Sequence, residues 1–359
     1  MKEGSIILCN HVTTADQFLV GAAVKGPSYY MASMDLFQNR FAGKLIKYLV
    51  NPIPKEKSNP SDLNAVKACL KLARENGNIV IFPEGNRTYS GKLGYVEPSI
   101  VKLVKVLKKP LVLMNIRGGY GIDPRWSLKS RKGKMELSIK SITPYEEIEK
   151  MSNDELYKFI IDSITVNDFD FHKKYKCKNR AEYLERVFYK CPICKKYHTI
   201  STKKHTVYCK ECGLEVVYGE DLRFVANNSD FKFKTISDWY DWQIEEAVNK
   251  TYIEDELIYS DDCKLYEPII WKKKKFIGKG KVELYGDYFL FNLENAKVRL
   301  NFDDIAAVTL VGKKKMNLYS NGKTYQIVND ERTNLLKYMH AYYIIKNRKV
   351  GKNNEFIGI

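Results

Sequence analysis

Hydrophobic and polar positions alternate in blocks along the first 165 residues, and the lengths of these blocks predict strands and helices in turn. Short apolar runs such as residues 5–9 are typical of strands buried on both faces. The clearest helix runs from Asp62 to Glu75, where we expect Ser61 as N-cap and Gly77 as stop. The pattern predicts strands over residues 5–9, 28–33, 50–53, 78–82, 110–116 and 134–142, and helices over 14–24, 36–49, 62–75, 96–107 and 144–165.

This alternation favours an α/β domain at residues 1–165, with a largely parallel sheet flanked by helices. In such sheets, ligands bind beyond the carboxyl ends of the strands. Two loops rich in polar residues leave predicted strands at that position, residues 10–16 and 83–88. We therefore look for a functional site in these two loops.

The first loop holds an imidazole and a carboxylate, His11 and Asp16. On one continuous helix, residues five apart point in different directions, so the two could not meet. We expect Thr14 and Gln17 to form a capping box that opens the helix, which leaves His11 in the loop and Asp16 in the first turn. Asp16 could then orient the imidazole while its second nitrogen acts as a general base. The alternative is a loop histidine beside a carboxylate that only stabilises the helix dipole.

The second loop, residues 83–88, combines a turn glycine with a basic side chain. Gly85 lets the backbone bend sharply, and the guanidinium of Arg87 presents a planar set of donors that suits a phosphate. Lys55, just after the predicted strand at residues 50–53, would add positive charge to the same anion site.

The two loops together resemble a known family. Asn10-His11-x4-Asp16, followed by Phe82-Pro83-Glu84-Gly85-Asn86-Arg87, is similar to the motifs of the glycerophospholipid acyltransferases, whose PlsC-like members are 1-acylglycerol-3-phosphate acyltransferases. The resemblance covers about residues 1–150. It implies transfer of a fatty acyl group from an acyl-CoA or acyl carrier protein thioester to a hydroxyl of a lysophospholipid or glycerol phosphate. It also implies that His11 is the general base and Asp16 its partner, and that Glu84, Gly85, Asn86 and Arg87 form the acceptor-phosphate site.

The sequence departs from the family pattern at three positions. Asn86 stands where the family usually has Thr or Ser, and Met114 stands where it usually has Pro. Lys55 stands where an arginine is usual, which keeps the charge but loses bidentate geometry. These changes bear on the choice of acceptor.

The chain carries a strong positive charge, +17 over 359 residues. Residues 1–150 hold 24 basic and 13 acidic side chains, so most of the surplus lies on the half that contains His11. Such a field suits an anionic partner such as a phospholipid surface, an acidic carrier protein or nucleic acid. The sequence shows no membrane-spanning run and no signal peptide, so we expect a cytoplasmic protein that is peripheral to the inner face of the cell membrane.

Two close cysteine pairs predict a metal site in residues 180–220. Cys191 and Cys194 are followed by Cys209 and Cys212, a spacing typical of a zinc ribbon. Four thiolates would fill the coordination shell, so we expect a structural Zn²⁺. His198 and His205 lie between the pairs and could replace a sulfur, but with four thiolates available we expect them to be surface residues of the hairpin. We expect the other four cysteines to be buried thiols: Cys9, Cys69, Cys177 and Cys263. Cys9, close to His11, is also conceivable as a nucleophile.

The rest of the chain predicts a helical linker at residues 221–260 and a small β domain at 261–350. In the linker, residues 235–245 look helical, and their two tryptophans fit either packing on a neighbouring domain or a lipid interface. Short β runs at 281–291, 297–301, 305–312, 316–320 and 323–328 precede a helix at 331–346. The pattern resembles PH/GRAM-like barrels, and lysines 272–275 and 313–315 would give it basic loops for lipid or protein.

The sequence therefore favours an acyltransferase of phospholipid synthesis. One alternative is a basic nucleic-acid-binding protein with a zinc ribbon, which leaves the first two motifs unexplained, so we do not expect nucleic acid as a partner. The other is a catalytically inactive lipid-binding regulatory protein.

Overall fold

The computed structural model describes residues 3–35, 52–55, 62–269 and 272–358. The chain forms two compact units. The first unit comprises residues 1–125 and 130–175, and the second comprises residues 126–129 and 176–358. The predicted helix at 36–49 and the predicted cap Ser61 lie outside the described residues.

A six-stranded sheet with the order β3-β2-β4-β1-β5-β6 forms the centre of the first unit. All neighbours are parallel except β5 and β6, which are antiparallel. This confirms the α/β class and the largely parallel sheet. Strands β1 and β4 are buried along their whole length, as their apolar sequences predict. The strands are β1 (Ile6–Cys9), β2 (Ser28–Ser33), β3 (Ile53–Lys55), β4 (Asn78–Ile81), β5 (Leu111–Arg117) and β6 (Glu136–Thr143).

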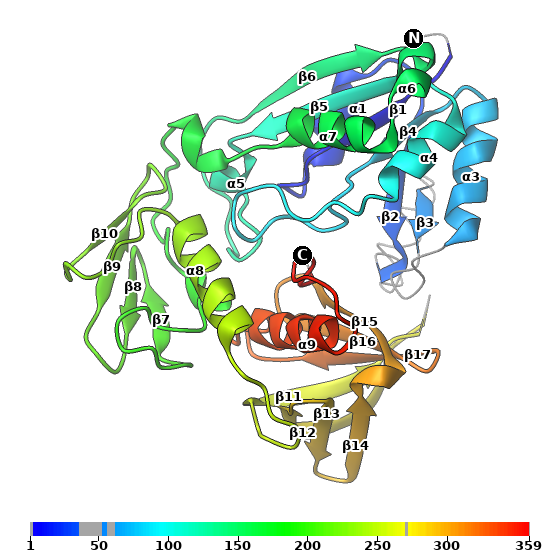
Figure 1. Ribbon diagram of the computed structural model, residues 1–359. Helices are drawn as coiled ribbons and strands as arrows, with labels where there is room; N and C mark the ends of the chain where they lie inside the picture. Colours follow the sequence, from blue (N-terminus) through cyan, green and yellow to red (C-terminus); the bar gives the residue numbers. More distant parts are fainter. Residues whose placement is uncertain (1–2, 36–51, 56–61, 270–271, 359) are drawn as a thin grey trace. The chain divides into compact units, whose positions relative to one another are not determined.

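Helices α3 (Leu63–Arg74), α4 (Ile100–Leu107) and α7 (Asn153–Ile164) lie in series along this sheet (Figure 1), from β3 and β4 to β5 and β6. Their apolar residues pack with Ile6, Leu8 and Ile81 into one core. The first unit also contains α1 (Asp16–Ala23), the short helix α5 (Gly119–Ile122), α6 (Tyr145–Lys150) and the 3₁₀ turn η2 (Asp168–Phe171).

Several helix boundaries differ from the prediction. Helix α4 begins at Ile100 instead of residue 96, and the last helix spans Leu336–Lys349 instead of 331–346. The single helix expected at 144–165 is two helices, because the Ser152 hydroxyl accepts the amide of Glu155 in a capping box that starts α7 afresh. Helix α3 begins at Leu63, and its N-cap is Asp62, whose carboxylate accepts the amides of Asn64 and Ala65.

The second unit starts with a four-stranded antiparallel sheet of order β10-β9-β8-β7. Helix α8 (Ile236–Asn249) follows, capped by Thr235. Trp239 of α8 is fully buried and stacks on Phe188, with ring centroids 4.0 Å apart. This tryptophan therefore packs in the protein interior. The strands are β7 (Ile200–Lys203), β8 (Thr206–Cys209), β9 (Glu215–Tyr218) and β10 (Phe224–Ala226), with the 3₁₀ turn η3 (Leu184–Arg186) before them.

Seven antiparallel strands and a final helix, α9 (Leu336–Lys349), complete the second unit (Figure 1). The strand order is β14-β13-β12-β11-β17-β16-β15, so β14 and β15 are edges and the sheet is not closed by pairing between described strands. Tyr338, Tyr342 and Ile344 of α9 are fully buried. The strands are β11 (Tyr259–Glu267), β12 (Lys275–Leu284), β13 (Tyr288–Leu293), β14 (Ala296–Asn301), β15 (Ile305–Val311), β16 (Lys315–Ser320) and β17 (Lys323–Val328), with η4 (Phe302–Asp304) between β14 and β15.

The predicted β runs hold with two differences. The run expected at 281–291 is two strands, β12 and β13, separated by the turn at 285–287, and β11 was not predicted at all. None of the helices within the described ranges combines the length and the apolar sequence needed to cross a bilayer.

Candidate active site

His11 and Asp16 meet at the carboxyl end of β1. The imidazole Nδ1 lies 2.7 Å from the Asp16 carboxylate, which is fully buried, whereas the His11 side chain is 22% exposed. The Asp16 carboxylate accepts a hydrogen bond from Nδ1–H, so the tautomer with an unprotonated Nε2 that can face substrate is favoured. Nε2 has no partner among the described residues. The imidazole also stacks on Phe82, with centroids 4.5 Å apart.

The Asp16 carboxylate is held rigidly by the loop that precedes it. It accepts the backbone amides of Val12, at 2.6 Å, and Thr13, at 2.9 Å, together with the Thr13 hydroxyl at 2.6 Å. These donors satisfy a buried charge and fix the direction in which it faces His11.

The predicted capping box at Thr14 and Gln17 is wrong. Ala15 is the N-cap of α1 and provides no side-chain cap. The hydroxyl of Thr14 instead donates to the carboxylate of Asp123, over 2.8 Å, and the Gln17 amide donates to the carbonyl of Thr14. A partner distant in sequence therefore replaces the local cap, although His11 still lies in the loop and Asp16 in the first turn.

The second motif lies directly against the first. Glu84 is buried, and its two carboxylate oxygens accept the amides of His11, at 2.6 Å, and Gly94, at 2.7 Å. The amide of Thr88 donates to the carbonyl of His11. Burial raises the pKa of Glu84 to about 8 against the opposing effect of these amides. Both oxygens of Glu84 thus face the backbone, and its contact with an acceptor stays a prediction.

The turn of the second motif needs its glycine. Gly85 is exposed and has a φ of +66°, a left-handed conformation that other residues seldom adopt. A Cβ at Gly85 would meet no atom within 4 Å, so the constraint lies in the backbone conformation and not in space. The next residue, Asn86, is half-buried in the same turn.

Arg87 is half-buried and forms an ion pair with Asp123. Its Nη1 donates to the Asp123 carboxylate over 2.8 Å and to the Asp123 carbonyl over 3.3 Å. Nε and Nη2 have no partner within the part of the chain that the structure describes. Part of the guanidinium is therefore available to a ligand. The sequence did not reveal Asp123, because it belongs to neither motif.

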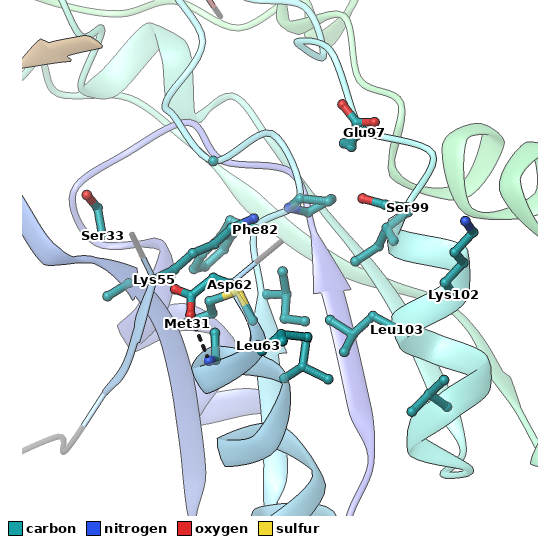
Figure 2. A pocket seen from close by; sticks show the side chains of 18 residues that line it. Met31, Ser33, Lys55, Asp62, Leu63, Phe82, Glu97, Ser99, Lys102 and Leu103 are labelled. Atoms are coloured by element: carbon teal, nitrogen blue, oxygen red, sulfur yellow. Dashed lines mark hydrogen bonds between the residues drawn. The ribbon is translucent and has the colours of Figure 1, made fainter. Parts of the chain in front are cut away.

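A pocket opens beside the two motifs, between α3 and α4 (Figure 2). Its volume is about 370 Å³, and Phe82, whose ring stacks on His11, is part of its wall. Figure 2 shows Met31, Lys55 and Phe82 on one side and Lys102 and Leu103 on the other. Most of the lining is apolar: Met31, Ala32, Leu63, Ala65, Val66, Ile81, Pro83, Ile100, Leu103 and Val106.

Lys55 therefore lies at the pocket, although its contact with a phosphate remains a prediction. Cys9 is fully buried, and burial raises the pKa of its thiol well above the usual value. A thiol in this state is a poor nucleophile, so the structure gives Cys9 the packing role expected for a buried strand residue.

The four paired cysteines of the second unit converge as the spacing predicts. All four Sγ atoms lie within 4.8 Å of one another, and the pairs Cys191–Cys212 and Cys194–Cys209 are each 3.7 Å apart. Tetrahedral zinc with Zn–S bonds of about 2.3 Å needs sulfur atoms separated by about 3.8 Å. The cluster therefore fits Zn²⁺ with four thiolates, and His198 faces Lys337, whose Nζ is 3.0 Å from its Nδ1.

Comparison with known proteins finds similarity in the amino-terminal region. Residues 1–117 match the sequence model of the acyltransferase family. The 1-acyl-sn-glycerol-3-phosphate acyltransferase of Bacillus subtilis is 29% identical over 137 residues, which are 38% of this chain and 65% of the relative. That of Cocos nucifera is 26% identical over 144 residues, 39% of this chain and 45% of the relative. The matches thus span less than two thirds of these curated relatives.

Among solved structures, the 1-acyl-sn-glycerophosphate acyltransferase PlsC of Thermotoga maritima matches 46% of this chain and 64% of its own, with 20% identity and a TM-score of 0.39. A carboxy-terminal domain of an unknown protein from Leishmania infantum matches 26% of this chain and 84% of its own, with 12% identity and a TM-score of 0.17.

Proposed function

We propose that this chain, whose amino-terminal region carries the sequence of the acyltransferase family, transfers a fatty acyl group from a thioester to a hydroxyl of a lysophosphatidic acid-type acceptor. The observation that carries the proposal is the 2.7 Å contact between His11 Nδ1 and Asp16, with the imidazole stacked on Phe82 of the pocket wall. An intact dyad also disfavours the catalytically inactive alternative.

In the proposed reaction, the acceptor hydroxyl attacks the thioester carbonyl while His11 Nε2 removes the hydroxyl proton. The imidazolium that forms is stabilised by the buried carboxylate of Asp16. When the tetrahedral intermediate collapses, the C–S bond breaks and His11 returns the proton to the thiolate of coenzyme A or acyl carrier protein. An ester and a free thiol are the products, and no acyl-enzyme is needed.

The pocket and the basic residues suggest where the substrates bind. We propose that the apolar lining between α3 and α4 takes the acyl chain, since burial of each methylene contributes about 0.8 kcal/mol. We propose that the free donors of Arg87, with Gly85 and Asn86 in the turn and Lys55 at the pocket, bind the acceptor phosphate.

The second unit would support this enzyme. We propose that the four-cysteine cluster binds a structural Zn²⁺, which stabilises a module too small for a core of its own. We also propose peripheral attachment to the inner face of the cell membrane, supported by the net charge of +17 and the attraction of lysine and arginine to anionic lipid. The β domain would contribute a lipid or protein contact there.

Thiol release tests the proposal. Purified protein is supplied with acyl-CoA or acyl carrier protein thioesters and a panel of lysophospholipids, and free thiol is recorded with and without acceptor. We expect acceptor-dependent release, with one donor class preferred. Binding of oligonucleotides that weakens steeply with salt, without thioester consumption, would favour the nucleic-acid alternative.

The same assay tests the role of Arg87. Arg87→Ala should lower the rate with phosphorylated acceptors at least tenfold more than the rate with unphosphorylated ones, because only the phosphorylated acceptors would bind Nε and Nη2. Equal losses for both acceptor classes would remove Arg87 from the phosphate site.

A further inference from the structure

One carboxylate oxygen joins the two motifs. Oδ2 of Asp123 accepts the backbone amide of Thr14 over 3.0 Å and its hydroxyl over 2.8 Å, and also Nη1 of Arg87 over 2.8 Å. Thr14 belongs to the loop that carries His11, and Arg87 belongs to the second motif. Asp123 thus contacts both loops from a third part of the chain.

The surroundings leave Asp123 and Arg87 little freedom. The Arg87 side chain is 14% exposed and that of Asp123 12%. Asp123 is the C-cap of α5, and its amide donates to the carbonyl of Gly119, the first residue of that helix. The amides of Gly118 and Tyr120, at the start of α5, donate to Asp168. This chain of contacts places the carboxylate before any ligand arrives.

Arg87 is fixed at its backbone as well. Its carbonyl accepts Nη1 of Arg125 over 3.0 Å, and the Arg125 guanidinium stacks on Tyr89 at 4.5 Å. Because Arg125 holds the backbone and Asp123 holds Nη1, the rotation of the guanidinium is restricted. This restriction also limits the directions in which the remaining donors, Nε and Nη2, can point.

We propose that Asp123 is a positioning residue of the acceptor site, which orients Arg87 for the acceptor phosphate and ties it to the His11 loop through Thr14. This inference rests on the proposed function. Among the described residues, the Asp123 carboxylate contacts Arg87 and Thr14 but not His11, so it acts through Arg87 and Thr14.

Two effects of Asp123 on a phosphate oppose each other. Its negative charge weakens the attraction between Arg87 and an anion, whereas its hydrogen bond orders a long side chain in advance. We expect ordering to prevail, because both side chains are largely withdrawn from water and the guanidinium must meet the phosphate with two donors at once. Removal of the carboxylate should then weaken phosphate binding and not strengthen it.

The experiment combines kinetics with a binding measurement that needs no turnover. The control variant is Asp162→Asn, which breaks an exposed ion pair with Lys158 on α7. It is compared with four test variants: Asp123→Ala, Asp123→Asn, Arg87→Ala and the double variant Asp123→Ala/Arg87→Ala. KM and kcat are measured for phosphorylated and unphosphorylated acceptors and for the thioester. Binding of glycerol 3-phosphate is measured by calorimetry, and folding is checked by thermal melting.

We expect Asp123→Ala to raise KM for the phosphorylated acceptor and Kd for glycerol 3-phosphate about tenfold, with KM for the thioester unchanged. Asp123→Asn, which keeps one acceptor oxygen, should lie between Asp123→Ala and the wild type, and Asp162→Asn should match the wild type. In the Arg87→Ala background, Asp123→Ala should change KM for the phosphorylated acceptor less than about twofold, because the guanidinium that Asp123 positions is absent.

Other outcomes overturn the inference. Tighter phosphate binding in Asp123→Ala would show that the negative charge of Asp123 outweighs its ordering of Arg87. An equal loss of phosphate affinity with Arg87 present and with Arg87→Ala would show that Asp123 acts independently of Arg87. If Asp123→Ala does not fold, Asp123→Asn decides between the same outcomes. If the wild type transfers acyl groups and the Asp123 variants match it, the inference about Asp123 is wrong and the proposed function stands. If the wild type neither transfers acyl groups nor binds glycerol 3-phosphate, the proposed function is wrong as well.

Discussion

The carboxylate of Glu84 accepts a hydrogen bond from the backbone amide of His11 over 2.6 Å, so a residue of the second motif holds the loop of the first. This contact gives Glu84 a structural role that is separate from the phosphate contact proposed for Arg87. Glu84 directs both of its carboxyl oxygens to backbone amides, those of His11 and Gly94, and thereby holds the His11 loop against the second motif.

The buried Glu84 predicts a pH dependence of stability. Its pKa is about 8 in the folded chain and about 4.3 in an unfolded one. Between these values the folded chain keeps a proton that the unfolded chain has lost, so rising pH lowers the free energy of unfolding, by about 5 kcal/mol over the whole interval. We expect the urea midpoint to fall between about pH 5 and pH 8.5, and to fall less in Glu84→Gln. Parallel curves for the two proteins would contradict this.

Asp16→Asn should lower kcat about 100-fold or more, because the neutral amide supports the imidazolium poorly and can favour the wrong tautomer of His11. KM for the acceptor should change little. The variant should also melt at a lower temperature, since Asp16 accepts two backbone amides. Steady-state kinetics with Asp162→Asn as control checks this, and wild-type kcat in Asp16→Asn would refute the dyad.

The pocket between α3 and α4 should set the acyl chain length. Leu103 lines it, and Leu103→Trp should lower kcat/KM for long-chain thioesters at least tenfold while medium-chain thioesters react nearly as before. Leu70→Trp is the matched control, because Leu70 is also half-buried against the core but does not line the pocket. An unchanged chain-length profile in Leu103→Trp would place the acyl chain elsewhere.

Metal analysis should find one zinc per wild-type chain. Cys209→Ser should lose it and destabilise the second unit by several kcal/mol, whereas Cys177→Ser, at a half-buried cysteine outside the cluster, should keep it. A wild-type chain free of zinc, with all four thiols open to titration, would contradict a metal site.

The sequence was sufficient where local patterns decide structure. Apolar runs located the strands, and the placement of His11 and Asp16 after β1 followed from their spacing. The four cysteines were found because their spacing is itself a geometric requirement of the metal.

The sequence was insufficient where a distant partner decides. The Thr14 hydroxyl donates to Asp123 instead of capping α1. Asp123 belongs to no recognisable motif, and its position follows from the four-residue helix α5, which it caps. Strand β11 was missed because its outward face is strongly polar. Exposed Asp262 and Lys264 alternate there with buried Cys263 and Leu265. Aspartate and lysine have low β propensity, which masked the alternation that marks a half-buried strand.

His11→Ala gives the most direct measurement of whether this dyad performs the chemistry. Acceptor-dependent thiol release is recorded for the wild type, for His11→Ala and for His172→Asn, in which an exposed histidine of the same unit is replaced by a residue that tolerates its φ of +46°. We predict that release falls to background in His11→Ala at an unchanged melting temperature and stays at the wild-type level in His172→Asn. Full activity in a folded His11→Ala protein would contradict general-base catalysis by His11.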